Sequence, residues 1–171
     1  MNKELKQALL IWDRKQTEYL ANIYHQYKSV DHFLNDLLEI CSIREAHVPV
    51  TWIIKYQIDQ KEELEDEVIN RLLTFIPEFG EWEAKLHVLQ ILPSITIPPS
   101  FTTSLDDFIR ECLEDQNKFV RAWAYQGMYE LTKLVPAYRD ELERRCVQAL
   151  ETESASIKVR VRKVLASLRP N

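Results

Sequence analysis

The chain has 171 residues, of which 46% are hydrophobic, so it is long enough to bury a core of its own as one domain. Only two residues are glycine, which argues against a turn-rich β fold and excludes a glycine-rich loop that cradles phosphates. The formal net charge of -5 gives no general attraction to nucleic acids or anionic membranes.

The first segment, residues 1–29, is expected to form an N-terminal capping helix. Its apolar residues, including Leu5, Leu9 and Trp12, fall on one helical face, and a pause in this stripe leaves a break near Gln16 open. The apolar run at the start is too short for a secretory signal, and no stretch approaches the length of a membrane span. We therefore expect a cytoplasmic protein without membrane contact, whose three widely spaced cysteines are reduced core residues.

Four later segments each carry two apolar stripes with a helical period, which predicts a pair of helices in each segment. The clearest stripe has apolar or small residues at i, i+4, i+7, i+8 and i+11: Val120, Ala124, Gly127, Met128 and Leu131. The same spacing recurs from Ala84 and Ile157, and most of it recurs from Ala46. An interval of about 37 residues between these anchors indicates stacked helix pairs. The predicted pairs are residues 30–58, 63–97, 100–134 and 136–169.

The turn before the clearest stripe carries a family resemblance. Asp115, followed by four residues and then Val120-Arg121, resembles the Asp-x4-Val-Arg turn of HEAT repeats. The other copies depart from this turn, since in place of its acidic and basic residues they have Phe79 with Lys85, and Thr152 with Lys158. The resemblance implies an all-α fold, a short right-handed α-solenoid of about four HEAT-like helix pairs with an N-terminal capping helix. These elements are expected to form a single helical-repeat domain, residues 1–171, and a helical bundle without repeats is the alternative.

The chain lacks the residue patterns of common catalytic and metal sites. Its histidines, at positions 25, 32, 47 and 87, do not have the i, i+3 or i, i+4 spacing of helical metal ligands, and no nucleophile elbow or Cys-x-x-Cys occurs. His87 follows Glu83 by one helical turn, which predicts a surface ion pair. We expect no enzyme, no metal and no cofactor, although a catalytic set drawn from distant helices stays open.

The resemblance to HEAT repeats also implies that the second helix of each pair lines a concave binding side. Positions one and five after each anchor flank the core stripe and combine cationic with apolar or aromatic side chains, which are types enriched at binding hot spots. The residues predicted to contact a partner are Lys85, Leu89, Arg121, Tyr125, Lys158 and Arg162. A simpler interpretation of Arg121 is an ion pair with Asp115 that orders the structural repeat turn, which also includes Val120.

The last predicted helix, residues 155–168, is basic in an acidic protein. Four cations lie on it, and no acidic residue follows Ile157: the cations are Lys158, Arg160, Arg162 and Lys163. One interpretation is a polar outer face that keeps the terminal repeat soluble. The leading hypothesis for the whole chain is a non-catalytic protein-binding scaffold or adaptor whose partner is another protein. The alternative is a nucleic-acid-binding HEAT-like protein, including one related to the alkylated-base DNA glycosylases that resemble HEAT stacks.

Overall fold

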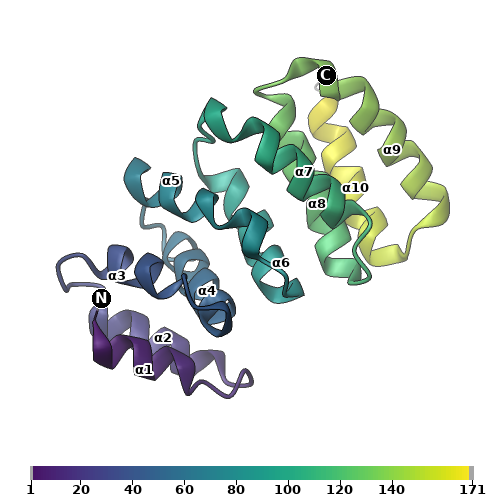
Figure 1. Ribbon diagram of the computed structural model, residues 1–171. Coiled ribbons are helices and arrows are strands. Elements are labelled where there is room, and N and C mark those ends of the chain that lie inside the picture. Colours follow the sequence, from purple (N-terminus) through teal and green to yellow (C-terminus); the bar gives the residue numbers. More distant parts are fainter. Residues whose placement is uncertain (1, 170–171) are drawn as a thin grey trace. The chain divides into compact units, whose positions relative to one another are not determined.

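The computed structural model describes residues 2–169, and within them the chain is all-helical (Figure 1). Ten α-helices and five short 3₁₀ turns follow one another, and no strand occurs among these residues. The expected all-α class is therefore confirmed. The chain divides into two compact units, residues 1–88 and 89–171, and each is described by itself.

The first unit is built from helix pairs whose members are neighbours in the sequence. Its elements are α1 (Lys3–Leu10), α2 (Thr17–Tyr27), α3 (Phe33–Ile40), a 3₁₀ turn (Arg44–Ala46), α4 (His47–Asp59), α5 (Asp66–Thr74), a second 3₁₀ turn (Ile76–Glu78) and most of α6 (Trp82–Ile91). Helix α1 packs on α2 and α3, and α3 packs in turn on α4 and α5. Because α2 also packs on α4, first helices lie beside first helices and second beside second in this unit.

The N-terminal segment is two helices and not the single capping helix expected, because the chain turns between Ile11 and Gln16, where the sequence left a break open, and forms the hairpin α1–α2. The turn is held by a hydrogen bond from Trp12 Nε1 to the carbonyl oxygen of Gln16 at 3.0 Å. Arg14 has a φ of 63°, in the left-handed region, which is incompatible with a continuous helix.

The expected surface ion pair between His87 and Glu83 is also replaced by other contacts. His87 is largely buried, and its Nδ1 lies 3.0 Å from Thr51 Oγ1 on α4. Burial lowers the pKa of His87 to about 4, with a smaller contribution from the Lys55 ammonium. Glu83 instead accepts a hydrogen bond from Arg14 at 3.0 Å.

The second unit contains two helix pairs, α7–α8 and α9–α10. Its elements are the 3₁₀ turns Leu92–Ser94, Pro99–Phe101 and Pro136–Tyr138 and the helices α7 (Thr102–Leu113), α8 (Lys118–Thr132), α9 (Arg139–Thr152) and α10 (Ala155–Leu168). The second helices, α8 and α10, make the most extensive helix–helix contact in the unit. The predicted bounds of the last helix, residues 155–168, are confirmed.

A close approach of helices explains why α8 contains a glycine. A Cβ atom on Gly127 would lie 3.1 Å from Leu89 Cδ2 and 3.2 Å from Ile109 Cδ1 on α7. Both neighbours are fully buried, at 0% exposure, so they have little room to move aside. Leu89, predicted to contact a partner, is thus a core residue beneath α8.

The predicted apolar stripes form the core of both units. All five stripe residues that begin at Val120 are buried, and so are their counterparts from Ala46, including the polar Gln57. The three cysteines are buried thiols, as expected. None of the described helices combines the length and the apolar character that a membrane span requires. The regular solenoid arrangement of the pairs and their number stay predictions.

Candidate binding groove on helices α8 and α10

The turn that precedes α8 is built by its own polar side chains. Asp115 Oδ1 accepts a hydrogen bond from the main-chain nitrogen of Asn117 at 2.8 Å. Asn117 Oδ1 then caps α8 by accepting from the main-chain nitrogen of Phe119 at 2.9 Å. These two hydrogen bonds fix the start of α8 and therefore the position of Phe119 in its first turn.

Arg121 joins this turn to the next one. Its Nη1 donates to the carbonyl oxygen of Asp115 at 2.8 Å, and its Nε and Nη2 donate to the two carboxylate oxygens of Glu153 at 3.0 and 3.1 Å. The predicted link between Arg121 and Asp115 includes a hydrogen bond to the Asp115 main-chain carbonyl and an attraction to the Asp115 charge, and Arg121 forms an ion pair with Glu153 at the end of α9. The hydrogen bonds to Glu153 raise the pKa of Arg121.

The remaining residues predicted to contact a partner are mostly covered. Tyr125 is 8% exposed and faces α9, close to Cys146, and burial raises its pKa. Lys85 is 7% exposed, and Lys158 donates to the carbonyl oxygen of Glu151 at 3.3 Å. Arg162 is the member of the predicted set that is exposed. Positions one and five after the anchors border the core stripe, which explains why Lys85, Leu89 and Tyr125 are buried.

The exposed side of α8 and α10 instead forms a groove of about 190 Å³. It is lined by Phe119, Ala122 and Trp123 from α8 and by Ser156, Val159, Arg160 and Lys163 from α10. Phe119 and Val159 are 49% and 53% exposed. Relative to the anchors Val120 and Ile157 these residues lie one position before and two, three or six positions after, so they face away from the core stripe by the helical period. We call this set the α8/α10 groove.

A stacked pair forms one wall of the α8/α10 groove. The guanidinium carbon of Arg160 lies 3.7 Å from the centroid of the Trp123 ring, at the distance of a cation–π contact. Both side chains are half-buried, and burial lowers the pKa of Arg160. Arg160 remains charged at neutral pH, because a guanidinium is not deprotonated in proteins. The pair holds a flat apolar ring and a cation in one place.

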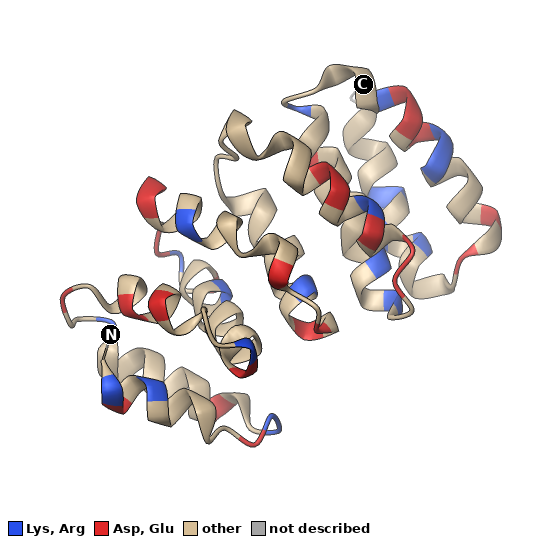
Figure 2. Ribbon diagram, viewed as in Figure 1, with Lys and Arg blue, Asp and Glu red and all other residues tan. Residues whose placement is uncertain are grey.

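The cations near the α8/α10 groove have no anionic partner in the described part of the chain. Lys118, Arg160, Arg162 and Lys163 form neither a hydrogen bond through their charged groups nor an ion pair with a residue between positions 2 and 169. Lys118 lies over the Phe119 ring, 5.3 Å from its centroid. Figure 2 shows Lys and Arg without Asp or Glu along α10. This surface therefore presents unneutralised positive charge beside exposed apolar side chains.

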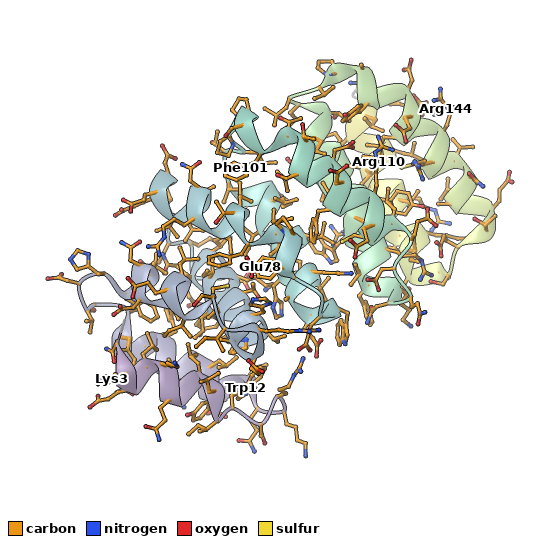
Figure 3. All side chains as sticks on the ribbon, viewed as in Figure 1. Lys3, Trp12, Glu78, Phe101, Arg110 and Arg144 are labelled. Carbon is orange, nitrogen blue, oxygen red and sulfur yellow. The ribbon has the colours of Figure 1, made fainter. Side chains whose placement is uncertain are left out.

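In the other layer of the unit, Arg110 and Arg145 are paired with carboxylates. Arg110 on α7 (Figure 3) binds Asp106 at 3.0 Å and forms two hydrogen bonds to Glu141 on α9, at 2.7 and 3.0 Å. Arg145 adds a further hydrogen bond to Glu141 at 2.9 Å. Hydrogen bonds from these guanidinium groups lower the pKa of Glu141 to about 2. Arg110 and Arg145 thus hold α7 and α9 together through Glu141, whereas Arg160, Arg162 and Lys163 on α10 form no such pair with a described residue.

No group of three or more His, Cys, Asp or Glu side chains able to hold a metal is present among residues 2–169. Comparison of the chain with protein-family models, with curated proteins and with solved structures finds no match. The function is therefore argued from the α8/α10 groove itself. Sequence reasoning missed Phe119, Ala122 and Val159, although apolar residues opposite a core stripe are a signal that could have identified them.

Proposed function

We propose that this chain is a non-catalytic protein-binding scaffold that uses the α8/α10 groove. The observation that carries the proposal is the exposure of Phe119 and Val159 in the same groove as the stacked Trp123–Arg160 pair. Exposed apolar side chains that cluster beside polar groups mark interaction surfaces, and Trp and Arg are enriched among residues that dominate binding energy.

The scaffold we propose is a HEAT-like stack of helix pairs. Two features support it: the recurrence of the core stripe at a near-constant interval, and the side-by-side packing of second helices, α2 with α4 and α8 with α10. Its concave side would then carry the α8/α10 groove. Small-angle X-ray scattering tests the arrangement, since a solenoid gives an elongated particle and a non-repeat bundle gives a compact one.

A cytoplasmic location is part of the same proposal. Cys41, Cys112 and Cys146 are all buried thiols, which suits a reducing compartment. Burial raises the pKa of both Cys41 and Cys146 to about 12, so neither is a reactive thiolate at neutral pH. They are therefore assigned to packing and not to catalysis.

The test of the binding proposal compares three forms of the full chain as bait in quantitative affinity capture. The Phe119→Ser/Val159→Ser double variant removes apolar surface from the α8/α10 groove, and Val147→Ser removes a similarly exposed valine from α9. We expect a protein captured by the wild type and by Val147→Ser to be lost with the double variant. Capture that is the same for all three forms contradicts the proposal.

Nucleic-acid contact is the second candidate function, and the unneutralised cations on α10 favour it. A protein that neutralises several phosphates binds with steep salt dependence. Titration of single-stranded and duplex DNA at low and moderate salt tests this candidate. Absence of binding at low salt removes it, together with its glycosylase variant.

A further inference from the structure

We infer that the occupant of the α8/α10 groove is an acidic amphipathic helix of a partner protein. This inference rests on the proposed function, because it specifies the chemistry of the partner that the groove binds. The observations that carry it are the shape of the groove, its exposed apolar side chains and the unneutralised charge around it.

The shape of the site suits a third helix. Helices α8 and α10 lie side by side, and the groove runs between their exposed faces. A helix that lies on two packed helices places its apolar side chains in the groove between them, at positions i, i+3 or i+4, and i+7. A volume of about 190 Å³ accommodates one or two such aliphatic side chains, which would contact Phe119 and Val159.

The charge around the groove selects an acidic partner. Lys163 and Arg160 stand on the α10 side, and Lys118 lies at the start of α8. Their charged groups have no acidic neighbour within the described residues, so carboxylates on the flanks of a bound helix would supply the missing partners. A basic helix would bring like charges together and would be rejected.

The contacts of the aromatic rings favour a helix over a nucleic acid. Single-stranded nucleic acids bind through bases that stack on open aromatic faces. One face of Trp123 is occupied by Arg160, and Lys118 lies over Phe119. The exposed surfaces of Val159 and Phe119 are apolar, which suits Leu, Ile or Met side chains. The net charge of -5 repels a long polyanion. A short acidic helix interacts mainly with the cations next to the groove.

The experiment measures binding of a panel of fluorescent acidic amphipathic peptides to the full chain by anisotropy. Each peptide has Leu, Ile or Met at i, i+4 and i+7, with Glu on both flanks. Each is compared with a Glu→Lys version and with a scrambled version that has the same composition. We expect at least one acidic peptide to bind and its two matched peptides not to bind.

Variants of the chain locate the binding surface. Lys163→Glu should weaken binding of the peptide about fivefold or more, because it reverses a charge at the groove. Phe119→Ser/Val159→Ser should weaken it about tenfold or more. The control is Arg144→Glu, which makes the same kind of change at an exposed arginine of α9 (Figure 3) and should stay within about twofold. Circular dichroism confirms that each variant keeps its helical content.

Three outcomes overturn the inference. The first is that no acidic peptide in the panel binds. The second is that binding is equally weakened by Arg144→Glu and by Lys163→Glu. The third is that an oligonucleotide, or a second copy of the chain seen by analytical ultracentrifugation, occupies the groove in place of the peptides. If affinity capture still yields a protein whose binding requires Phe119 and Val159, the proposed function stands. Only the inference that the partner is an acidic helix is then contradicted.

Discussion

Arg121 on α8 and Glu153 at the end of α9 form a two-point ion pair that joins the turns of two successive helix pairs. Their side chains are 22% and 21% exposed, so solvent screens the pair only partly. Arg121 also donates to the Asp115 carbonyl oxygen. One side chain therefore orders its own turn and attaches it to the next pair.

This relationship predicts the cost of breaking it. Arg121→Ala should lower the free energy of unfolding by about 2 kcal/mol, because it removes a bidentate ion pair and the hydrogen bonds to the turn carbonyls. Glu153→Gln should cost about 1 kcal/mol, since it keeps part of the hydrogen bonding. Urea unfolding followed by circular dichroism measures both. Lys55→Ala, which breaks a more exposed pair with Asp59 on α4, is the control and should cost less than about 0.5 kcal/mol.

Gly127 gives a prediction about helix packing. Replacing a glycine inside an exposed helix by alanine usually stabilises a protein by about 1 kcal/mol. At position 127 the new Cβ would meet Leu89 and Ile109 at 3.1 and 3.2 Å, and both are fully buried. Gly127→Ala should therefore give no stabilisation, and Gly127→Leu should unfold this unit. A gain of about 1 kcal/mol for Gly127→Ala would show that α7 and α8 are less closely packed.

Two tyrosines of α2 differ in the hydrogen bonding of their hydroxyl groups, so their phenylalanine variants can be compared. Tyr24 is fully buried, and no hydrogen-bond partner for its hydroxyl lies among the described residues, whereas the Tyr19 hydroxyl donates to the Ala8 carbonyl oxygen at 3.1 Å. Burial raises the pKa of Tyr24, and the Glu62 carboxylate raises it further. Tyr24→Phe should leave the free energy of unfolding unchanged or higher, and Tyr19→Phe should lower it by about 1 kcal/mol. A larger loss of thermal stability in Tyr24→Phe than in Tyr19→Phe would contradict these contacts.

His87 predicts a dependence of stability on pH. Its pKa is lowered from 6.5 to about 4 in the folded chain, so the unfolded chain takes up a proton first as the pH falls. The stability from neutral His87 is therefore complete above pH 6.5 and is lost as the pH falls towards 4. Between pH 7.5 and 5 the loss should be about 2 kcal/mol. In urea titrations at the two pH values, the free energy of unfolding of His87→Gln should fall by about 2 kcal/mol less than that of the wild type. Equal losses in the wild type and the variant would contradict the lowered pKa of His87.

The stripe from Val120 to Leu131 and the bounds of the last helix could be predicted because they follow from local periodicity. The ion-pair partner of Arg121 could not, because Glu153 lies in the next helix pair and sequence spacing does not reveal side-chain distance. The same limit applies to Tyr125, whose exposure depends on α9. The pause in the apolar stripe left a break near Gln16 open, but the left-handed conformation of Arg14 could not be predicted, because neither glycine nor proline marks the turn.

Site-specific photo-crosslinking tests most directly whether the α8/α10 groove is the binding surface. A photo-reactive phenylalanine placed at Phe119 or, separately, at Val147 on α9 samples two surfaces of similar exposure in the same unit. We predict that a protein partner crosslinks strongly from position 119 and at background level from position 147. Equal crosslinking from both positions, or crosslinking from position 147 alone, would contradict binding at the α8/α10 groove.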